Sequence, residues 1–219
     1  RSFKKEFKRQ LRFAIIAAIG FLIAFSWRNA IYRSANSIVE KFTDLADQAN
    51  GSVLFQYGNS IVLATVVMSA HTREGLDYFP LTVDYEEKFY AAGQILGSRF
   101  MRREGRPSEE AILSGRMVDR TIRPLFVQHI RNEVQVVITV LSISEDDPDV
   151  LAINAASLAL ATSNIPWSGP VSAVRIGKLA GSDEWIVNPT YAERNSAEFE
   201  LDLLACGRGG TINMIEVAS

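Results

Sequence analysis

The chain has 219 residues, 47% of them hydrophobic and 22% charged, with a formal net charge of −2 at pH 7. This length is enough to bury a core, and the composition excludes a disordered, collagen-like or low-complexity protein. The single cysteine, Cys206, excludes an internal disulfide framework, and His71 and His129 lie too far apart in the sequence to form a metal-ligand motif.

The small net charge hides an uneven distribution along the chain. Residues 1–12 contain six Lys or Arg and one Glu, whereas residues 99–123 contain seven Arg against four acidic residues. The remainder of the chain is acidic. A basic island on an acidic background is a candidate site for anions.

Residues 13–27, with the sequence FAIIAAIGFLIAFSW, form an uncharged apolar run behind the basic residues 1–12. The basic flank favours a membrane-associated helix, although these 15 residues fall short of the roughly 20 that a membrane span needs. The core of a secretory signal peptide and a buried helix are the alternatives. We therefore expect residues 1–42 to form a separate basic and apolar helical segment, with a membrane as its candidate partner, and residues 43–219 to form a folded domain.

From residue 43 onward, short β-branched or apolar runs alternate with turn residues, which is the pattern of β-strands. Gly58-Asn59 predicts a hairpin between the first two strands, and the glycines at 207–210 predict a hairpin between the last two. The predicted strands are Ser52–Tyr57, Ile61–Met68, Phe79–Tyr85, Glu133–Ser144, Val171–Ile176, Trp185–Val187, Glu198–Ala205 and Thr211–Val217.

Two helices are expected among these strands. Acidic residues in the first turn and Pro124 just past the end predict a helix over Ser108–Ile122. A second helix is predicted from Asp147 to about Ser163, where small residues allow close packing on a sheet. The aspartates of the DDPD sequence at 146–149 favour a helix cap over a metal site. Strands with two packed helices indicate a layered domain of the α+β or α/β class.

Three arginines are expected to share one face of the first helix. Arg116, Arg120 and Arg123 are spaced at i, i+4 and i+7, so they span about 60° of the helix surface. Guanidinium groups match phosphate oxygens in geometry and charge, so this face is a candidate anion site. The alternative is a solvated face with salt bridges, because Asp119 is spaced to pair with Arg116 or Arg123.

A second basic group lies in the long connection from Gly93 to Pro107. Connections of this length are often functional. Basic residues beside an aromatic ring are what single-stranded nucleic acid binding requires, although Phe100 could equally anchor the loop by packing. The candidate RNA-binding residues here are Arg99, Phe100, Met101, Arg102, Arg103 and Arg106.

Several segments together resemble a known family. The sequences LADQANGSVLFQYG, REGRPS, DRTIRPLF and DPDVLA, in this order, are similar to the first ribonuclease PH-like domain of bacterial polynucleotide phosphorylases, over about Asp44–Ser219. The resemblance implies an α+β fold of the ribonuclease PH-like type, with a mixed sheet and packed helices, preceded here by the apolar N-terminal helix. It also implies a cytoplasmic enzyme of mRNA turnover, in which inorganic phosphate degrades single-stranded RNA from its 3′ end and releases nucleoside diphosphates.

The resemblance assigns roles to individual residues. Phe100, Met101, Arg102 and Arg103 correspond to a loop that grips RNA near the channel of a homotrimer, with Met in place of one aromatic. Arg116 and Arg120 correspond to arginines that line the catalytic cleft. Arg99, Arg106 and Arg123 are added as RNA-binding candidates because they extend the same basic island.

The resemblance places the remaining catalytic groups in a second ribonuclease PH-like domain. That domain holds the phosphate-binding serines and the catalytic aspartates with their Mg²⁺, so we expect no metal site in this chain and no activity from this chain alone. The alternative function is a non-catalytic module for RNA binding and trimer assembly, tethered to a membrane by residues 13–27.

Overall fold

The computed structural model describes residues 49–73, 75–95, 107–181, 185–196 and 199–218. The chain divides into two compact units, Arg1–Asp47 and Gln48–Ser219, and only the second contains described residues. The helix expected at 13–27 therefore lies outside the described residues and stays a prediction. Across the described ranges, no helix combines the length and the hydropathy needed to cross a bilayer.

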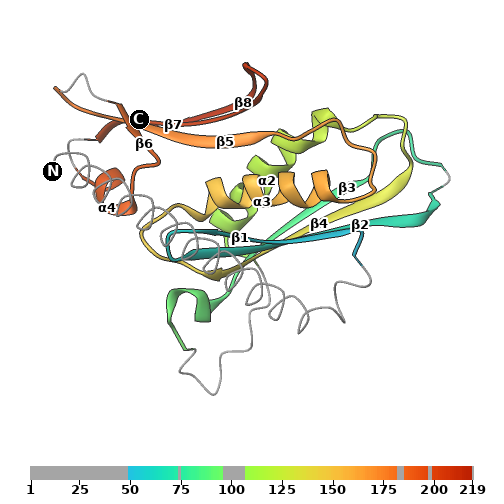
Figure 1. Ribbon diagram of the computed structural model, residues 1–219, viewed down its shortest axis with the longest axis horizontal. Coiled ribbons are helices and arrows are strands. Elements are labelled where there is room, and N and C mark those ends of the chain that lie inside the picture. The colour runs from blue at the N-terminus through green and yellow to red at the C-terminus, as the bar shows by residue number, and fades with distance from the viewer. Residues whose placement is uncertain (1–48, 74, 96–106, 182–184, 197–198, 219) are drawn as a thin grey trace, which may run out of the picture. The chain divides into compact units, whose positions relative to one another are not determined.

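The first sheet contains four strands in the order β1-β2-β4-β3 (Figure 1). Their bounds are β1 Gly51–Tyr57, β2 Ser60–Thr72, β3 Leu81–Glu87 and β4 Asn132–Ser142. β2 is antiparallel to both β1 and β4, whereas β3 is parallel to β4, so this sheet is mixed as predicted. Inward side chains of β2 and β4 are fully buried valine, alanine and isoleucine, which suits a pleated surface covered on one side.

The second sheet is antiparallel throughout and has the order β6-β5-β7-β8. Its strands are β5 Ser172–Leu179, β6 Trp185–Val187, β7 Phe199–Arg208 and β8 Thr211–Ala218. The sequence predicted a mixed sheet with packed helices without grouping the strands, and the strands form two sheets, of which the first is mixed. Periodicity locates strands but does not determine which of them pair, so the division into two sheets appears only in the structure.

The helices α2, Glu109–Ile122, and α3, Pro148–Thr162, lie between the two sheets (Figure 1). Ten of the fifteen residues of α3 are buried because the helix contacts β1 and β2 on one side and β5 on the other. α2 buries a narrower stripe that includes Val118 and Ile122. The predicted helices are confirmed, and short helices at Phe89–Ala92, Arg123–Leu125 and Tyr191–Arg194 (α4) were not predicted.

Side-chain caps begin both long helices. The Ser108 hydroxyl accepts a hydrogen bond from Ala111 N at 3.1 Å, and Asp147 Oδ1 accepts one from Asp149 N at 2.9 Å. The prediction that the DDPD sequence caps a helix is therefore confirmed. The two predicted hairpins also form, with Gly58 at φ +56° in the first turn and Gly209 and Gly210 at positive φ in the second.

Most predicted strands agree with the structure, but β2, β5 and β7 run three or four residues beyond their predicted ends. The predicted second strand ends at Met68, where the apolar run stops. Backbone pairing to β4 nevertheless resumes at Thr72, opposite Asn132. Backbone hydrogen bonds between paired strands do not require apolar side chains, so a strand can continue past the last residue of its apolar run.

Candidate functional site

A cleft of about 560 Å³ lies beside α2, the start of α3 and the second sheet. It is lined by equal numbers of positive and negative side chains, so its charge is balanced overall. The charged lining residues are Arg116, Arg120, Arg175, Arg194, Glu87, Glu110, Asp149 and Glu216.

The structure brings Arg116 and Arg120 together on this cleft, as the helical spacing predicted. Both side chains are exposed. Arg120 Nη1 donates to Glu216 Oε2 at 3.0 Å, while Arg116 has no hydrogen-bond or ion-pair partner among the described residues. As far as the described residues are concerned, all five N–H donors of Arg116 are therefore available to an incoming anion.

Arg123 lies apart from the cleft and contacts the protein itself. Its guanidinium donates to both carboxylate oxygens of Asp119, at 2.9 and 2.6 Å. It also donates to the carbonyl oxygens of Phe79 and Leu81, at 3.2 and 3.1 Å. Arg123 thus forms the salt bridge with Asp119 that was the alternative to an anion site, and it ties the end of α2 to the start of β3. Arg116 forms no such salt bridge among the described residues.

The loop candidates lie outside the described residues. Arg99, Phe100, Met101, Arg102, Arg103 and Arg106 all fall within residues 96–106. Their RNA-binding role stays a prediction.

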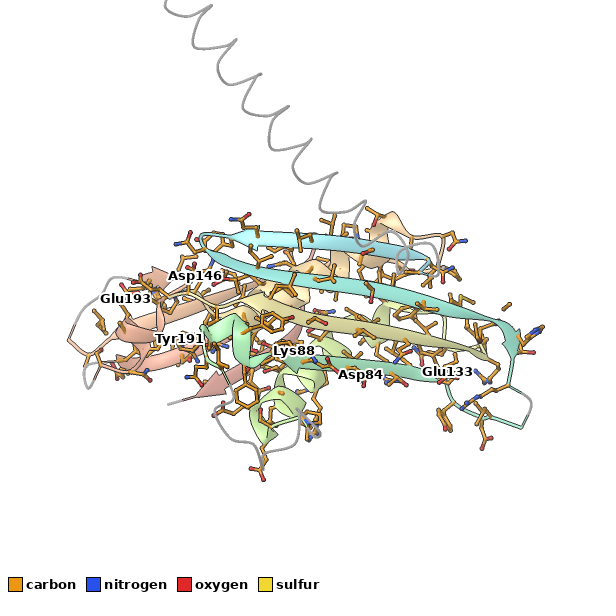
Figure 2. The ribbon with its side chains drawn as sticks, turned by 90° about the horizontal axis from the view of Figure 1, so that it is seen from below. Asp84, Lys88, Glu133, Asp146, Tyr191 and Glu193 are labelled. Carbon is orange, nitrogen blue, oxygen red and sulfur yellow. The ribbon has the colours of Figure 1, made fainter. Side chains whose placement is uncertain are left out.

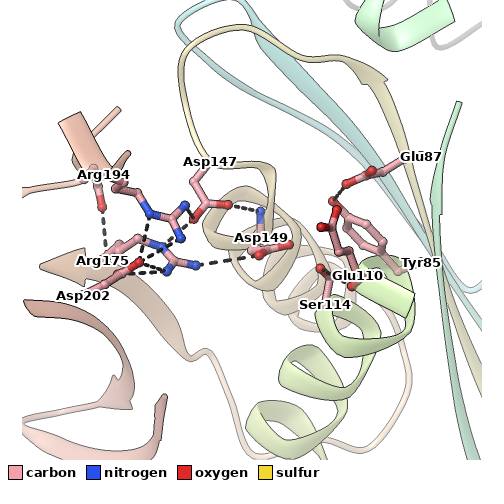
Figure 3. Close-up of polar contacts among 10 residues, drawn as sticks. Tyr85, Glu87, Glu110, Ser114, Asp147, Asp149, Arg175, Arg194 and Asp202 are labelled. Atoms are coloured by element: carbon pink, nitrogen blue, oxygen red, sulfur yellow. Dashed lines mark hydrogen bonds and ion pairs between the residues drawn. The ribbon is translucent and has the colours of Figure 1, made fainter. Parts of the chain in front are cut away.

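A buried ion-pair network borders the cleft (Figure 3). Asp147, with a side chain 5% exposed, pairs with the Arg175 Nε and, at 3.0 Å, with Arg194 Nη1. Arg175 Nη1 also pairs with Asp202 at 2.9 Å, and Arg194 Nη2 pairs with Asp202 at 2.8 Å. Asp149 completes the group at 3.7 Å from Arg175 Nη2. The network joins β5, β7, α4 and the start of α3.

Sequence reasoning missed this network, although one signal was present. Arg175 stands in the predicted strand Val171–Ile176, and the alternation of that strand puts it on the buried face. A buried guanidinium requires carboxylate partners, because desolvation of an unpaired charge is too costly. Its partners Asp147 and Asp202 are remote in the sequence, so only the fold identifies them.

Burial first, and after it the nearby charge of Asp147, together raise the pKa of the Asp149 carboxyl to about 6. The hydroxyl of Ser114 and the charge of Arg175 oppose this shift. Burial likewise raises the pKa of the Tyr85 phenol above its usual range, and that hydroxyl donates to Glu87 Oε1 at 2.9 Å. Burial would lower the pKa of Arg175, but the charges of Asp147 and Asp202 outweigh it and raise the pKa.

The cleft therefore has two chemically different parts. Arg116 and Arg120 form an exposed cationic edge suited to phosphate groups. Asp149, beside the buried ion-pair network and with its side chain 20% exposed, forms a more enclosed acidic part. Within the described part of the chain, no group of three or more His, Cys, Asp or Glu side chains is arranged to hold a metal ion.

Comparisons with known proteins give the family. Residues 39–166 match the model of the 3′ exoribonuclease family, domain 1. The chain is 54% identical over 173 residues to the polyribonucleotide nucleotidyltransferase of Thermomicrobium roseum, and 52% identical over 176 residues to that of Microcystis aeruginosa. These alignments cover 78% and 80% of this chain but only 21% and 24% of the relatives, so the chain spans less than a quarter of their length.

Solved structures support the same fold at lower identity. Rice Rrp46 superposes with a TM-score of 0.59 at 21% identity, covering 78% of this chain and 75% of that chain. The Archaeoglobus fulgidus exosome with RNA bound to the active site superposes with a TM-score of 0.56 at 20% identity, covering 78% and 73%. Since the family model matches more than half of the sequence, the chain belongs to the 3′ exoribonuclease family and carries its domain 1.

Proposed function

We propose that this chain supplies the first ribonuclease PH-like domain of a polyribonucleotide nucleotidyltransferase. The reaction is phosphorolysis of RNA from its 3′ end. An oxygen of inorganic phosphate attacks the terminal phosphodiester phosphorus, the bond to the preceding 3′ oxygen breaks, and a nucleoside diphosphate leaves. The shortened RNA keeps a 3′ hydroxyl, so the reaction can repeat along the strand.

The observation that carries the proposal is the exposed pair Arg116 and Arg120 on one face of α2. Phosphorolysis brings the anionic RNA backbone and inorganic phosphate into one site. Fixed guanidinium groups offset their mutual repulsion and the charge that develops in the transition state. The relatives' shared name, polyribonucleotide nucleotidyltransferase, supports this substrate class.

The described residues do not fit a Mg²⁺ site, since none of their carboxylate groups cluster suitably. The resemblance to polynucleotide phosphorylases assigns the Mg²⁺ to a second ribonuclease PH-like domain. Homotrimer assembly, a cytoplasmic location, a role in mRNA turnover and membrane contact through residues 13–27 are further parts of the proposal.

Replacement of both cleft arginines tests the RNA contact. Arg116→Ala with Arg120→Ala should weaken binding of a fluorescein-labelled single-stranded RNA and lower the salt dependence of log K. The expected drop is about 0.7 in slope for each lost phosphate contact. Fluorescence anisotropy at several salt concentrations measures both quantities.

Arg73→Ala is the matched control, because Arg73 is an exposed arginine outside the cleft lining that pairs with Glu133 at 3.2 Å. If the double variant and the control bind RNA with the same affinity and slope, the cleft does not contact RNA. Phosphate-dependent release of nucleoside diphosphates, measured with the domain in its full-length protein, then tests the reaction itself.

A further inference from the structure

A contact between β8 and the last turn of α2 holds one of the two cleft arginines. Arg120 Nη1 donates to Glu216 Oε2 at 3.0 Å, and the two side chains are 55% and 49% exposed. Nε and Nη2 of Arg120 make no other hydrogen bond among the described residues. The single contact therefore fixes the guanidinium while leaving most of its donors for a ligand.

Glu216 is carried by a well-anchored part of β8. Met214, two residues earlier, is 5% exposed and stands opposite the buried Cys206. A register shift between Cys206 and Gly207 adds one residue to β8 at Asn213. Asn213 Nδ2 donates to the Thr121 carbonyl oxygen of α2 at 2.9 Å.

These two contacts join the same turn of α2 to β8. Asn213 binds the backbone beside Arg120, and Glu216 binds its side chain. One turn earlier, Arg116 has no such partner among the described residues. The two cleft arginines thus differ in how they are held, although they share one helix face.

We propose that Glu216 is a positioning residue for Arg120, which it holds ready to bind a phosphate group of RNA. This inference rests on the proposed function of the cleft. A free arginine loses the freedom of several rotatable bonds when it binds phosphate, and an arginine already held loses less. The Glu216 carboxylate also repels the RNA. Replacement of Glu216 should therefore weaken RNA binding if positioning dominates and strengthen it if repulsion dominates.

Removal of the carboxylate tests the proposal in the full chain. Glu216→Ala should weaken binding of the labelled single-stranded RNA by about two- to five-fold, the range expected for a half-exposed ion pair. Glu216→Gln keeps a hydrogen-bond acceptor and should lose less. Tighter RNA binding by either variant would show that Glu216 only repels the ligand and would overturn the proposal.

Double variants assign the effect to Arg120. Glu216→Ala should not weaken RNA binding in the Arg120→Ala background, where only the repulsion is removed, and should weaken it fully in the Arg116→Ala background. Glu133→Ala is the control, because Glu133 forms an exposed ion pair with Arg73, is not among the cleft-lining residues and lies well away from the cleft residue Tyr191 (Figure 2). An equal loss in both arginine backgrounds would contradict positioning.

The positioning of Arg120 by Glu216 can also be measured without RNA. The order parameter of the Arg120 Nε–H group, from NMR relaxation, should fall in Glu216→Ala, while urea denaturation should show little change in stability. If Arg116→Ala and Arg120→Ala leave RNA affinity unchanged, the proposed function fails and this inference fails with it. If they weaken binding but the Glu216→Ala effect does not depend on Arg120, only the positioning role fails.

Discussion

Asp147 offers a direct test of the buried ion-pair network. One carboxylate oxygen caps α3 by accepting from Asp149 N, and the other pairs with Arg175 of β5 and Arg194 of α4. Asp147→Asn keeps the side-chain size and an oxygen for the cap but removes the charge. Asp147→Ala removes the cap as well.

The expected loss in the free energy of unfolding depends on the carboxylate partners that Arg175 and Arg194 keep. Loss of one partner of a buried ion pair costs about 3–5 kcal/mol when the other charge is left uncompensated. Here Arg175 and Arg194 both keep Asp202, and Arg175 keeps Asp149. We therefore expect Asp147→Asn to lower the free energy of unfolding by only about 2–3 kcal/mol, as for lost charged hydrogen bonds. Asp147→Ala should cost about 1 kcal/mol more, through the cap.

Urea denaturation at neutral pH measures both changes, with equal m-values taken as evidence that the same structure unfolds. Glu133→Gln is the control, since the Arg73–Glu133 pair is 63% and 41% exposed. Exposed pairs of this kind contribute about 1 kcal/mol at most. If Asp147→Asn costs no more than Glu133→Gln, the network does not stabilise the fold and the reasoning is refuted.

Two further predictions concern Asp149 and Gly51. The folded pKa of Asp149, about 6, lies above its usual value of 3.8, so the native state binds more protons than the unfolded state between these pH values. Stability should therefore fall by up to about 3 kcal/mol as pH rises through this window. The urea midpoint of Asp149→Asn should vary less across it, and an unchanged slope would contradict the assignment. A Cβ on Gly51 would lie 2.5 Å from the Ala159 carbonyl oxygen of α3, so Gly51→Ala should cost about 2 kcal/mol by overpacking. The exposed neighbour Ser52→Ala should cost little in the same assay, and equal costs would show that β1 and α3 separate freely.

The sequence by itself determined where the regular elements lie. Short β-branched or apolar runs between turn residues located the eight strands of the described part of the chain, and caps with flanking proline located α2 and α3, because these signals depend on neighbouring residues alone. The spacing of Arg116 and Arg120 likewise determined that they share a helix face, and the order of several short motifs along the chain led to the family.

The tertiary structure decided which distant residues meet. Arg123 was predicted on the same helix face as Arg116, yet Asp119 and the carbonyl oxygens of Phe79 and Leu81 engage it, and it does not line the cleft. Arg175 finds its carboxylate partners on α3 and β7, and Arg120 finds Glu216 on β8. The division of the strands into two sheets creates these contacts. Local sequence patterns do not predict this division into two sheets, since pairing between remote segments depends on how the whole core packs.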